Sequence, residues 1–130
     1  MTSLLANGME PDAAKRTHER YVARLKRAWA AGVNVVFGTD VMSNAKGRTR
    51  GELAIEYIDS FREAGIGAPN ILRAMTTHAA ALLGVENERG AIRPGMAADL
   101  VATPVNPLRQ IDGLKNINFV MKDGQIWRKP

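Results

Sequence analysis

The feature that most constrains the fold is a short apolar run that stops at an acid, residues 35–40 (VVFGTD). A run of β-branched and aromatic residues, bounded by glycines, is typical of a strand buried on both faces. A strand that ends in Gly-Thr-Asp places the carboxylate of Asp40 at the carboxyl edge of a sheet. That edge is where α/β barrels and open α/β sheets carry their chemistry. We therefore expect an α/β fold with Asp40 at its functional edge.

Helical periodicity surrounds this predicted strand. A first helix is predicted over residues 12–31, because Val22, Leu25 and Trp29 recur on one face. Two further helices are predicted over residues 52–64 and 70–83, separated by a glycine-rich break. In the last of these helices, the apolar residues predicted to form a buried stripe are Ile71, Leu72, Met75, Ala79, Leu82 and Leu83.

The last third of the chain has the pattern of a small antiparallel β segment. Strands are predicted over residues 98–103, 118–122 and 125–128. The last two flank Asp123-Gly124, which is the strongest short hairpin signal, and Pro94-Gly95 suits a type II turn.

The predicted strands are too few to complete a sheet: one lies alone between helices, and the β segment has at most three. One buried strand between helices leaves its backbone groups without neighbours on either side. The sequence therefore predicts an incomplete unit. Its open strand edges need a partner outside this chain or a second copy of it.

Composition bounds the class of protein. With 130 residues, 45% hydrophobic and 24% charged, the chain has the size and balance of one globular domain. It has no cysteine, which excludes a disulfide framework, a thiolate nucleophile and a cysteine-ligated zinc. This composition fits a reducing cytoplasm, where we expect the protein. Neither a signal peptide nor an apolar stretch of about 18 residues is present, so no membrane partner is expected.

The formal net charge of +5 raises the question of a nucleic-acid partner. Basic residues occur along the whole chain, and those of the first predicted helix are interpreted as a solvated face. There is no aromatic RNA-binding motif and no glycine-rich phosphate loop. Nucleic acid is therefore not the expected partner, and salt-dependent DNA binding is the test that would reveal one. The helix residues in question are Lys15, Arg16, Arg20, Arg24, Lys26 and Arg27.

Four motifs in order carry a resemblance to a known family. They are residues 31–40 (AGVNVVFGTD), 73–84 (RAMTTHAAALLG), 90–101 (GAIRPGMAADLV), and 106–108 (NPL) followed by 120–124 (VMKDG). From about residue 20 to residue 128 the chain resembles the amidohydrolase superfamily. The resemblance is to the branch that contains imidazolonepropionase-like enzymes and metal-dependent prolyl dipeptidases.

The resemblance implies a fold and an activity. Residues 1–84 would be the last part of a (β/α)8 barrel, with residues 33–37 as its eighth strand. Residues 85–130 would be the C-terminal part of a small β-sandwich that family members build from both chain ends. The implied reaction is metal-dependent hydrolysis of a C–N bond in an amide, peptide-like or cyclic amide substrate, with zinc as the expected divalent metal. Asp40 matches the acid that ligates the metal and takes a proton from the attacking water.

The chain lacks most of the metal ligands of this family. The His-x-His pair of the first strand and the ligands of the middle strands are absent. His18 is expected to be exposed, and His78 is expected to be a core residue. Asp40 alone cannot hold a hydrolytic zinc, which takes three protein ligands. The isolated chain is therefore expected to bind no metal and to be inactive until the missing N-terminal barrel portion, or self-association, completes it. The alternative is a non-enzymatic, self-associating module.

Two further assignments concern polar side chains outside the Asp40 position. Ser43, Asn44, Arg48 and Arg50 follow Asp40 in a loop that would rim the barrel mouth, where loops carry specificity. Contact with substrate and a solvated loop both remain open for these four residues. Asp99 is interpreted as a structural acid that accepts hydrogen bonds from backbone amides.

Overall fold

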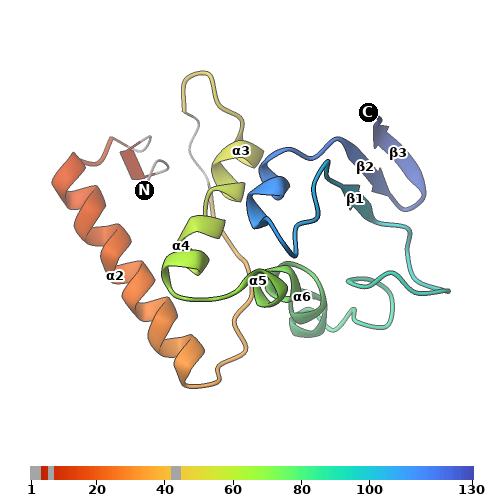
Figure 1. Cartoon of the computed structure of the whole chain (residues 1–130), viewed down its shortest axis with the longest axis horizontal. Helices are drawn as coiled ribbons and strands as arrows, with labels where there is room; N and C mark the ends of the chain where they lie inside the picture. Colours follow the sequence, from red (N-terminus) through yellow and green to blue (C-terminus); the bar gives the residue numbers. More distant parts are fainter. Residues whose placement is uncertain (1–3, 6–7, 42–44) are drawn as a thin grey trace. The chain divides into compact units, whose positions relative to one another are not determined.

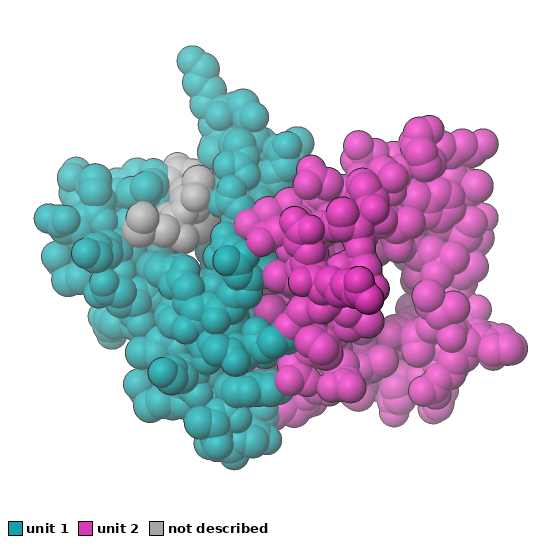
Figure 2. Space-filling view, viewed as in Figure 1, with its two compact units in different colours: residues 1–33, 38–67 teal, residues 34–37, 68–130 magenta. Residues whose placement is uncertain are grey.

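The computed structural model describes residues 4–5, 8–41 and 45–130, which form a mixed α/β fold (Figure 1). The chain divides into two compact units, coloured separately in Figure 2. Unit 1 comprises Met1–Val33 and Gly38–Gly67, and unit 2 comprises Asn34–Phe37 and Ala68–Pro130. The predicted boundary at residue 84, between a barrel part and a β-sandwich part, stays a prediction. In the described part of the chain, no helix is long and apolar enough to cross a bilayer.

The helices of unit 1 whose bounds the structure describes are α2 (Pro11–Ala30), α3 (Arg50–Ile55) and α4 (Ile58–Glu63). The first predicted helix is confirmed, and α2 packs against α4. The helix predicted over residues 52–64 is instead two short helices, α3 and α4. The start of α3 was missed, although Thr49 and Glu52 form a capping box there, the Thr-x-x-Glu signature of a helix start.

Unit 2 contains the helices α5 (Ala68–Met75) and α6 (Thr77–Leu82) and the 3-10 helix η1 (Ile111–Lys115). Its strands β1 (Leu100–Ala102), β2 (Phe119–Lys122) and β3 (Gln125–Arg128) form an antiparallel sheet in the order β1-β2-β3. The predicted β segment is therefore confirmed. Asp123 and Gly124 have positive φ angles of 48° and 78°, as a tight hairpin turn requires.

The strand predicted over residues 33–37 is wrong for this structure. Residues 33–40 carry no regular secondary structure, although Phe37 N–H donates to the carbonyl oxygen of Ala74 at 3.0 Å. In the described part of the chain, no strand pairs with this segment. Strand propensity is realised only where neighbouring strands supply hydrogen bonds and packing. The run of β-branched residues is thus left as an unpaired connection.

The buried stripe predicted for residues 70–83 is correct only in part. Ile71 is fully buried, whereas Leu82 and Leu83 are 65% and 74% exposed. The predicted single helix is broken at Thr76, whose φ and ψ of −128° and −92° are not helical. The Thr76 hydroxyl donates to the carbonyl oxygen of Leu72 at 2.7 Å. The break separates α6 from α5, so the apolar residues at the end of α6 do not continue the buried face of α5.

Gly90 marks the closest approach of the loop after α6 to the helix itself. Its φ is +94°, a left-handed backbone that L side chains rarely adopt. A Cβ atom at this position would lie 2.6 Å from the Ala80 Cβ and 3.1 Å from the Thr76 carbonyl oxygen. Only glycine therefore allows this loop to pack on α6.

We expect Gly90→Ala to destabilise the protein more than Gly84→Ala does. Both glycines have positive φ, at +94° and +70°, but a Cβ at Gly84 meets nothing within 4 Å. The left-handed backbone alone costs roughly 1–2 kcal/mol for an alanine. Clash at Gly90 adds to that cost. Urea unfolding of both variants measures the difference in their free energies of unfolding. Equal urea midpoints would contradict the close contact of Gly90 with Ala80.

Candidate functional site

Asp40 lies in unit 1, directly after the unpaired segment 33–37. Its φ is 45°, which makes it one of two non-glycine residues with positive φ in the described part of the chain. Aspartate is among the few residues that visit this region without large strain, because its short side chain can bond locally. Asp40 is exposed. Among the described residues, no hydrogen bond or ion pair involves its carboxylate, which is therefore available to a ligand or a proton.

Asp40 lines a pocket of about 470 Å³ within unit 1. The pocket combines one carboxylate with hydroxyl, imidazole and aromatic groups, and its volume falls in the range of small-molecule sites. Sequence reasoning missed the residues that α2 and the start of α4 contribute, because they occur singly and at ordinary helical spacing. The lining residues are Leu4, His18, Tyr21, Leu25, Gly38, Thr39, Asp40, Tyr57, Ser60 and Phe61.

His18 is the second titratable group of this pocket. The expectation that it is exposed is wrong, because its side chain is only 15% exposed. Its Nε2 lies 2.8 Å from the Glu63 carboxylate, at the end of α4. The packing of α2 on α4 places the imidazole between the two helices. His18 therefore has a structural partner on α4 and is not a free ligand.

The donor set of this chain does not fit a hydrolytic metal. In residues 4–5, 8–41 and 45–130, no three His, Cys, Asp or Glu side chains come close enough to hold a metal ion. A catalytic zinc takes three protein ligands and an open position. Asp40 can supply one ligand. His78 lies on α6 in unit 2, half-buried, with no hydrogen-bond partner for its Nδ1 in the described part.

The candidate substrate loop is described only in part. Ser43 and Asn44 lie outside the described residues. Arg48 is half-buried and forms an ion pair with Glu56, and this hydrogen bond raises the pKa of the guanidinium. Arg50 is exposed as the first residue of α3. The ion pair therefore links the residues just before and just after α3. Substrate contact by Ser43, Asn44, Arg48 or Arg50 stays a prediction.

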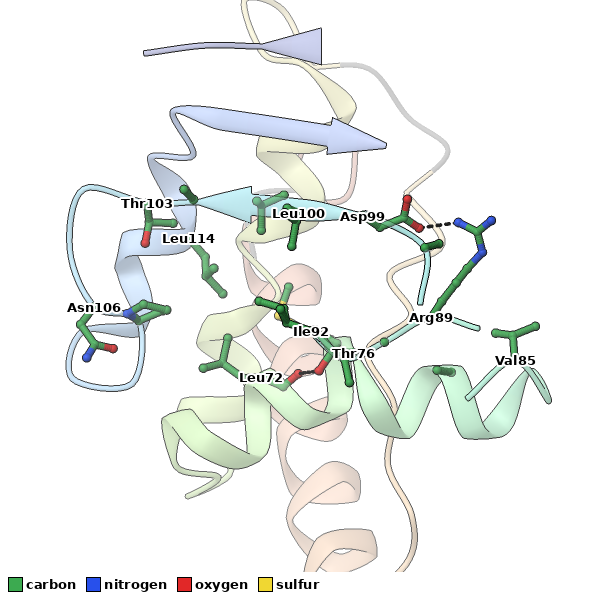
Figure 3. Close-up of a pocket in the computed structure, with 18 of the residues that line it drawn as sticks. Leu72, Thr76, Val85, Arg89, Ile92, Asp99, Leu100, Thr103, Asn106 and Leu114 are labelled. Atoms are coloured by element: carbon green, nitrogen blue, oxygen red, sulfur yellow. Dashed lines mark hydrogen bonds and ion pairs between the residues drawn. The ribbon is translucent and has the colours of Figure 1, made fainter. Parts of the chain in front are cut away.

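Unit 2 contains a separate groove of about 780 Å³, which the sequence did not indicate (Figure 3). Many of its lining side chains are apolar. They include Leu72 of α5, Val101 of β1 and, from the loop after β1, Val105. Polar groups in its wall are engaged internally: the Thr103 hydroxyl, for example, donates to the Val105 carbonyl oxygen at 2.6 Å. The groove therefore offers apolar surface and few free polar groups.

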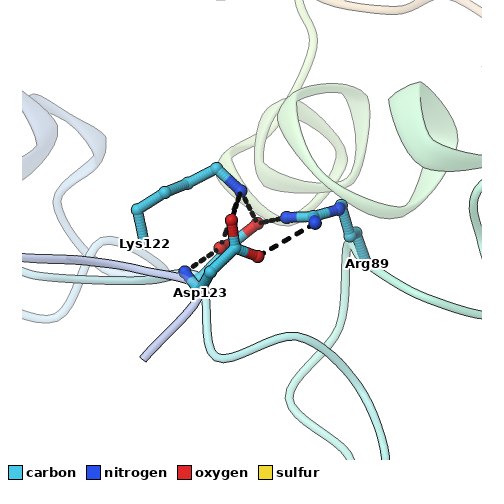
Figure 4. Close-up of polar contacts among 4 residues, drawn as sticks. Arg89, Lys122 and Asp123 are labelled. Carbon is cyan, nitrogen blue, oxygen red and sulfur yellow. Dashed lines mark hydrogen bonds and ion pairs between the residues drawn. The ribbon is translucent and has the colours of Figure 1, made fainter. Parts of the chain in front are cut away.

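At the edge of this groove, Asp99 is the centre of a charged cluster (Figure 4). Its carboxylate accepts a hydrogen bond from the backbone N–H of Asp123 at 2.8 Å. It also forms ion pairs with Arg89 at 2.5 Å and with Lys122 at 3.1 Å. The Asp123 side chain pairs with the same two cations, each at 2.9 Å. The Asp123 N–H, Lys122 and Arg89 together lower the pKa of Asp99 to about 2. The prediction of a structural acid that binds a backbone amide is confirmed.

A model of the amidohydrolase family matches residues 11–127. This is nearly the whole chain, and it includes Asp40, the groove and the Asp99 cluster. The chain therefore belongs to the amidohydrolase family, which is typically metal-dependent. The predicted resemblance is confirmed. A search of the curated proteins found no match.

Solved structures agree with this assignment. The chain is similar to a Xaa-Pro dipeptidase with bound methionine in the active site, with 31% identity and a TM-score of 0.72 over 82% of this chain. A prolidase complexed with N-methylphosphonate-L-proline is 25% identical, with a TM-score of 0.72 over 95%. A putative prolidase from Bifidobacterium longum is 28% identical, with a TM-score of 0.65 over 84%.

The match covers only part of each of these proteins. The chain spans 25%, 30% and 27% of the three solved chains, respectively. It therefore corresponds to about a quarter of the length of the relatives that it resembles.

We expect Asp99→Asn to destabilise unit 2 in a pH-dependent way. The pKa of Asp99 is lowered from 3.8 to about 2 on folding, so its ionised form stabilises the fold. This contribution is fully present above about pH 4 and disappears as the pH falls through 2. The variant should melt roughly 4 °C below the parent at pH 7.

The melting-temperature difference between parent and Asp99→Asn should shrink toward zero between pH 4 and pH 2. Glu86→Gln is the control, because it removes an exposed acid of the same unit. A gap that stays constant down to pH 2 would show that the cluster does not depend on the Asp99 charge.

Proposed function

We propose that this chain is the C-terminal part of a metal-dependent amidohydrolase that hydrolyses a C–N bond in a small amide or peptide-like substrate. The family match over residues 11–127 supports the class of reaction. The similarity to a Xaa-Pro dipeptidase and two prolidases favours a substrate such as a dipeptide that ends in proline. The observation that carries the proposal is the unpartnered carboxylate of Asp40, which follows the family's strand motif and faces a pocket.

In this proposal Asp40 acts as the general base. The oxygen of a water molecule forms a bond to the substrate carbonyl carbon while the Asp40 carboxylate takes a proton from that water. The proton then passes to the substrate nitrogen as the C–N bond breaks, which gives a carboxylic acid and an amine. The divalent metal of the family, expected to be zinc, takes most of its ligands from outside this chain. Asp40 is one ligand at most.

The proposal includes a partner and a location. The missing N-terminal portion of the barrel completes the site, either as a second polypeptide or as the rest of a longer chain. Support comes from the length of the solved relatives, of which this chain spans about a quarter. A cytoplasmic location is part of the same proposal and is supported by the absence of cysteine.

A second candidate function is a non-enzymatic module that associates with copies of itself. The observation that favours it is the sheet edge at β1, which among the described strands pairs with β2 alone and adjoins the apolar groove of unit 2. Exposed strand edges pair readily with other chains. Light scattering on the purified chain distinguishes the two candidates in part, because a stable monomer would count against the module.

We expect the isolated chain to hydrolyse no Xaa-Pro dipeptide above the blank, with or without added zinc. Co-expression with the N-terminal three quarters of a prolidase-like relative should restore hydrolysis. Asp40→Asn in the restored pair should lower kcat by about 10²–10⁴-fold, because a general base contributes that much.

Asp12→Asn, an exposed acid on α2, is the matched control and should leave the rate unchanged. Two results would contradict the proposal. One is hydrolysis by the isolated chain that depends on Asp40. The other is a restored pair whose rate does not change in Asp40→Asn.

A further inference from the structure

Helix α2 aligns four arginines on one face. Arg16, Arg20, Arg24 and Arg27 are separated by four, four and three residues, the spacing that places side chains along one side of a helix. All four are exposed. At a rise of 1.5 Å per residue, this arginine stripe is roughly 16 Å long. The helix is the long one at the N-terminal end in Figure 1.

The arginine stripe carries charge that the protein does not neutralise. Helix α2 holds six Lys or Arg and two Asp or Glu residues, a net +4 against +5 for the whole chain. In the described part of the chain, no carboxylate pairs with a stripe arginine. Arg24 instead lies over the Tyr21 ring, 5.9 Å from its centroid. Three arginines outside α2 do pair with acids, namely Arg48 with Glu56, Arg62 with Asp59 and Arg89 with Asp99.

The apolar side of α2 packs against its own unit, where Val22, Leu25 and Trp29 are half-buried. Ala14 is fully buried, α2 packs against α4, and His18 pairs with Glu63 at 2.8 Å. A basic helix that lies on a membrane inserts its apolar face into the lipid. Because α2 has that face packed against protein, its cationic face is presented without an apolar anchor. A ligand of this face would therefore be a polyanion held by charge and hydrogen bonds.

The chemistry of the stripe indicates which polyanion it binds. Arginine forms paired hydrogen bonds to phosphate oxygens, which lysine cannot reproduce. Duplex DNA presents one negative charge per about 1.7 Å of its axis, so a face roughly 16 Å long meets several phosphates. We propose that the arginine stripe of α2 binds the phosphate backbone of a nucleic-acid duplex, without reading its sequence.

This inference departs from the expectation drawn from the sequence. The sequence shows basic residues along the whole chain, whereas the helix brings four arginines to one face. Asp12 and Glu19 flank Arg16 on α2, yet in the described part of the chain neither acid forms an ion pair with the stripe. The proposal is independent of the hydrolase function, because it uses no residue of the Asp40 pocket. Its test therefore needs no enzymatic activity.

The test is fluorescence anisotropy of a labelled DNA duplex of about 20 base pairs, titrated with the full chain. Each phosphate contact contributes about −0.9 to the slope of log affinity against log salt. Four contacts predict that affinity falls roughly 150-fold between about 50 and 200 mM KCl. The variant Arg16→Gln/Arg20→Gln/Arg24→Gln/Arg27→Gln should lose at least about tenfold in affinity at the lower salt and most of the slope.

The matched control removes the same charge from unit 2. The variant Arg93→Gln/Arg109→Gln/Arg128→Gln/Lys129→Gln changes four exposed residues and should keep the parent slope. Circular dichroism checks the fold of each variant. If the quadruple variant does not fold, the double variant Arg20→Gln/Arg24→Gln takes its place. It is expected to lose half of the slope of log affinity against log salt.

Three outcomes would overturn the proposal. The first is no duplex binding at the lower salt. The second is an equal loss of affinity in the stripe variant and in the unit 2 control, which would mean attraction by net charge alone. The third is binding to vesicles that contain anionic lipid without binding to the duplex, which would assign the stripe to a membrane surface.

Discussion

Backbone pairing is the constraint on which the rest of this structure depends. Residues 33–37 have the composition of a buried strand, yet no strand of the described chain pairs with them. Asp40 follows this segment directly, so its position is set by a connection that lacks the ladder of a sheet. In a complete barrel the same segment would be hydrogen-bonded on both sides. In the proposed function, the site is therefore completed by the rest of the barrel and not by this chain alone.

The two units use charge in different ways. In unit 2 the carboxylate of Asp99 joins Arg89, Lys122 and the backbone of Asp123, so charges of both signs fasten the hairpin to the loop after α6. In unit 1 the arginines of α2 are left without acid partners. The first arrangement stabilises a fold, whereas the second leaves charge available to a ligand. This contrast is the physical basis for assigning a structural role to one cluster and a binding role to the other.

Local signals predicted the site only where its residues are adjacent in sequence. Asp40 follows an apolar run, and Asp99 lies at the start of a predicted strand, so both could be identified. His18 was placed in solvent because its neighbours on α2 are charged, whereas the packing of α2 on α4 covers it. Arg48 was a candidate for substrate contact, and its ion pair with Glu56 became visible only once α3 was defined.

The sequence by itself determined the long helix α2, the antiparallel β segment with its Asp123-Gly124 turn, and membership of the amidohydrolase family. These features depend on periodicity, turn chemistry and motif order, which are local. The tertiary structure decided the break at Thr76, the exposure of Leu82 and Leu83, and the absence of a strand at residues 33–37. It decided them because burial and strand pairing depend on partners distant in sequence, and this chain contains too few of those partners.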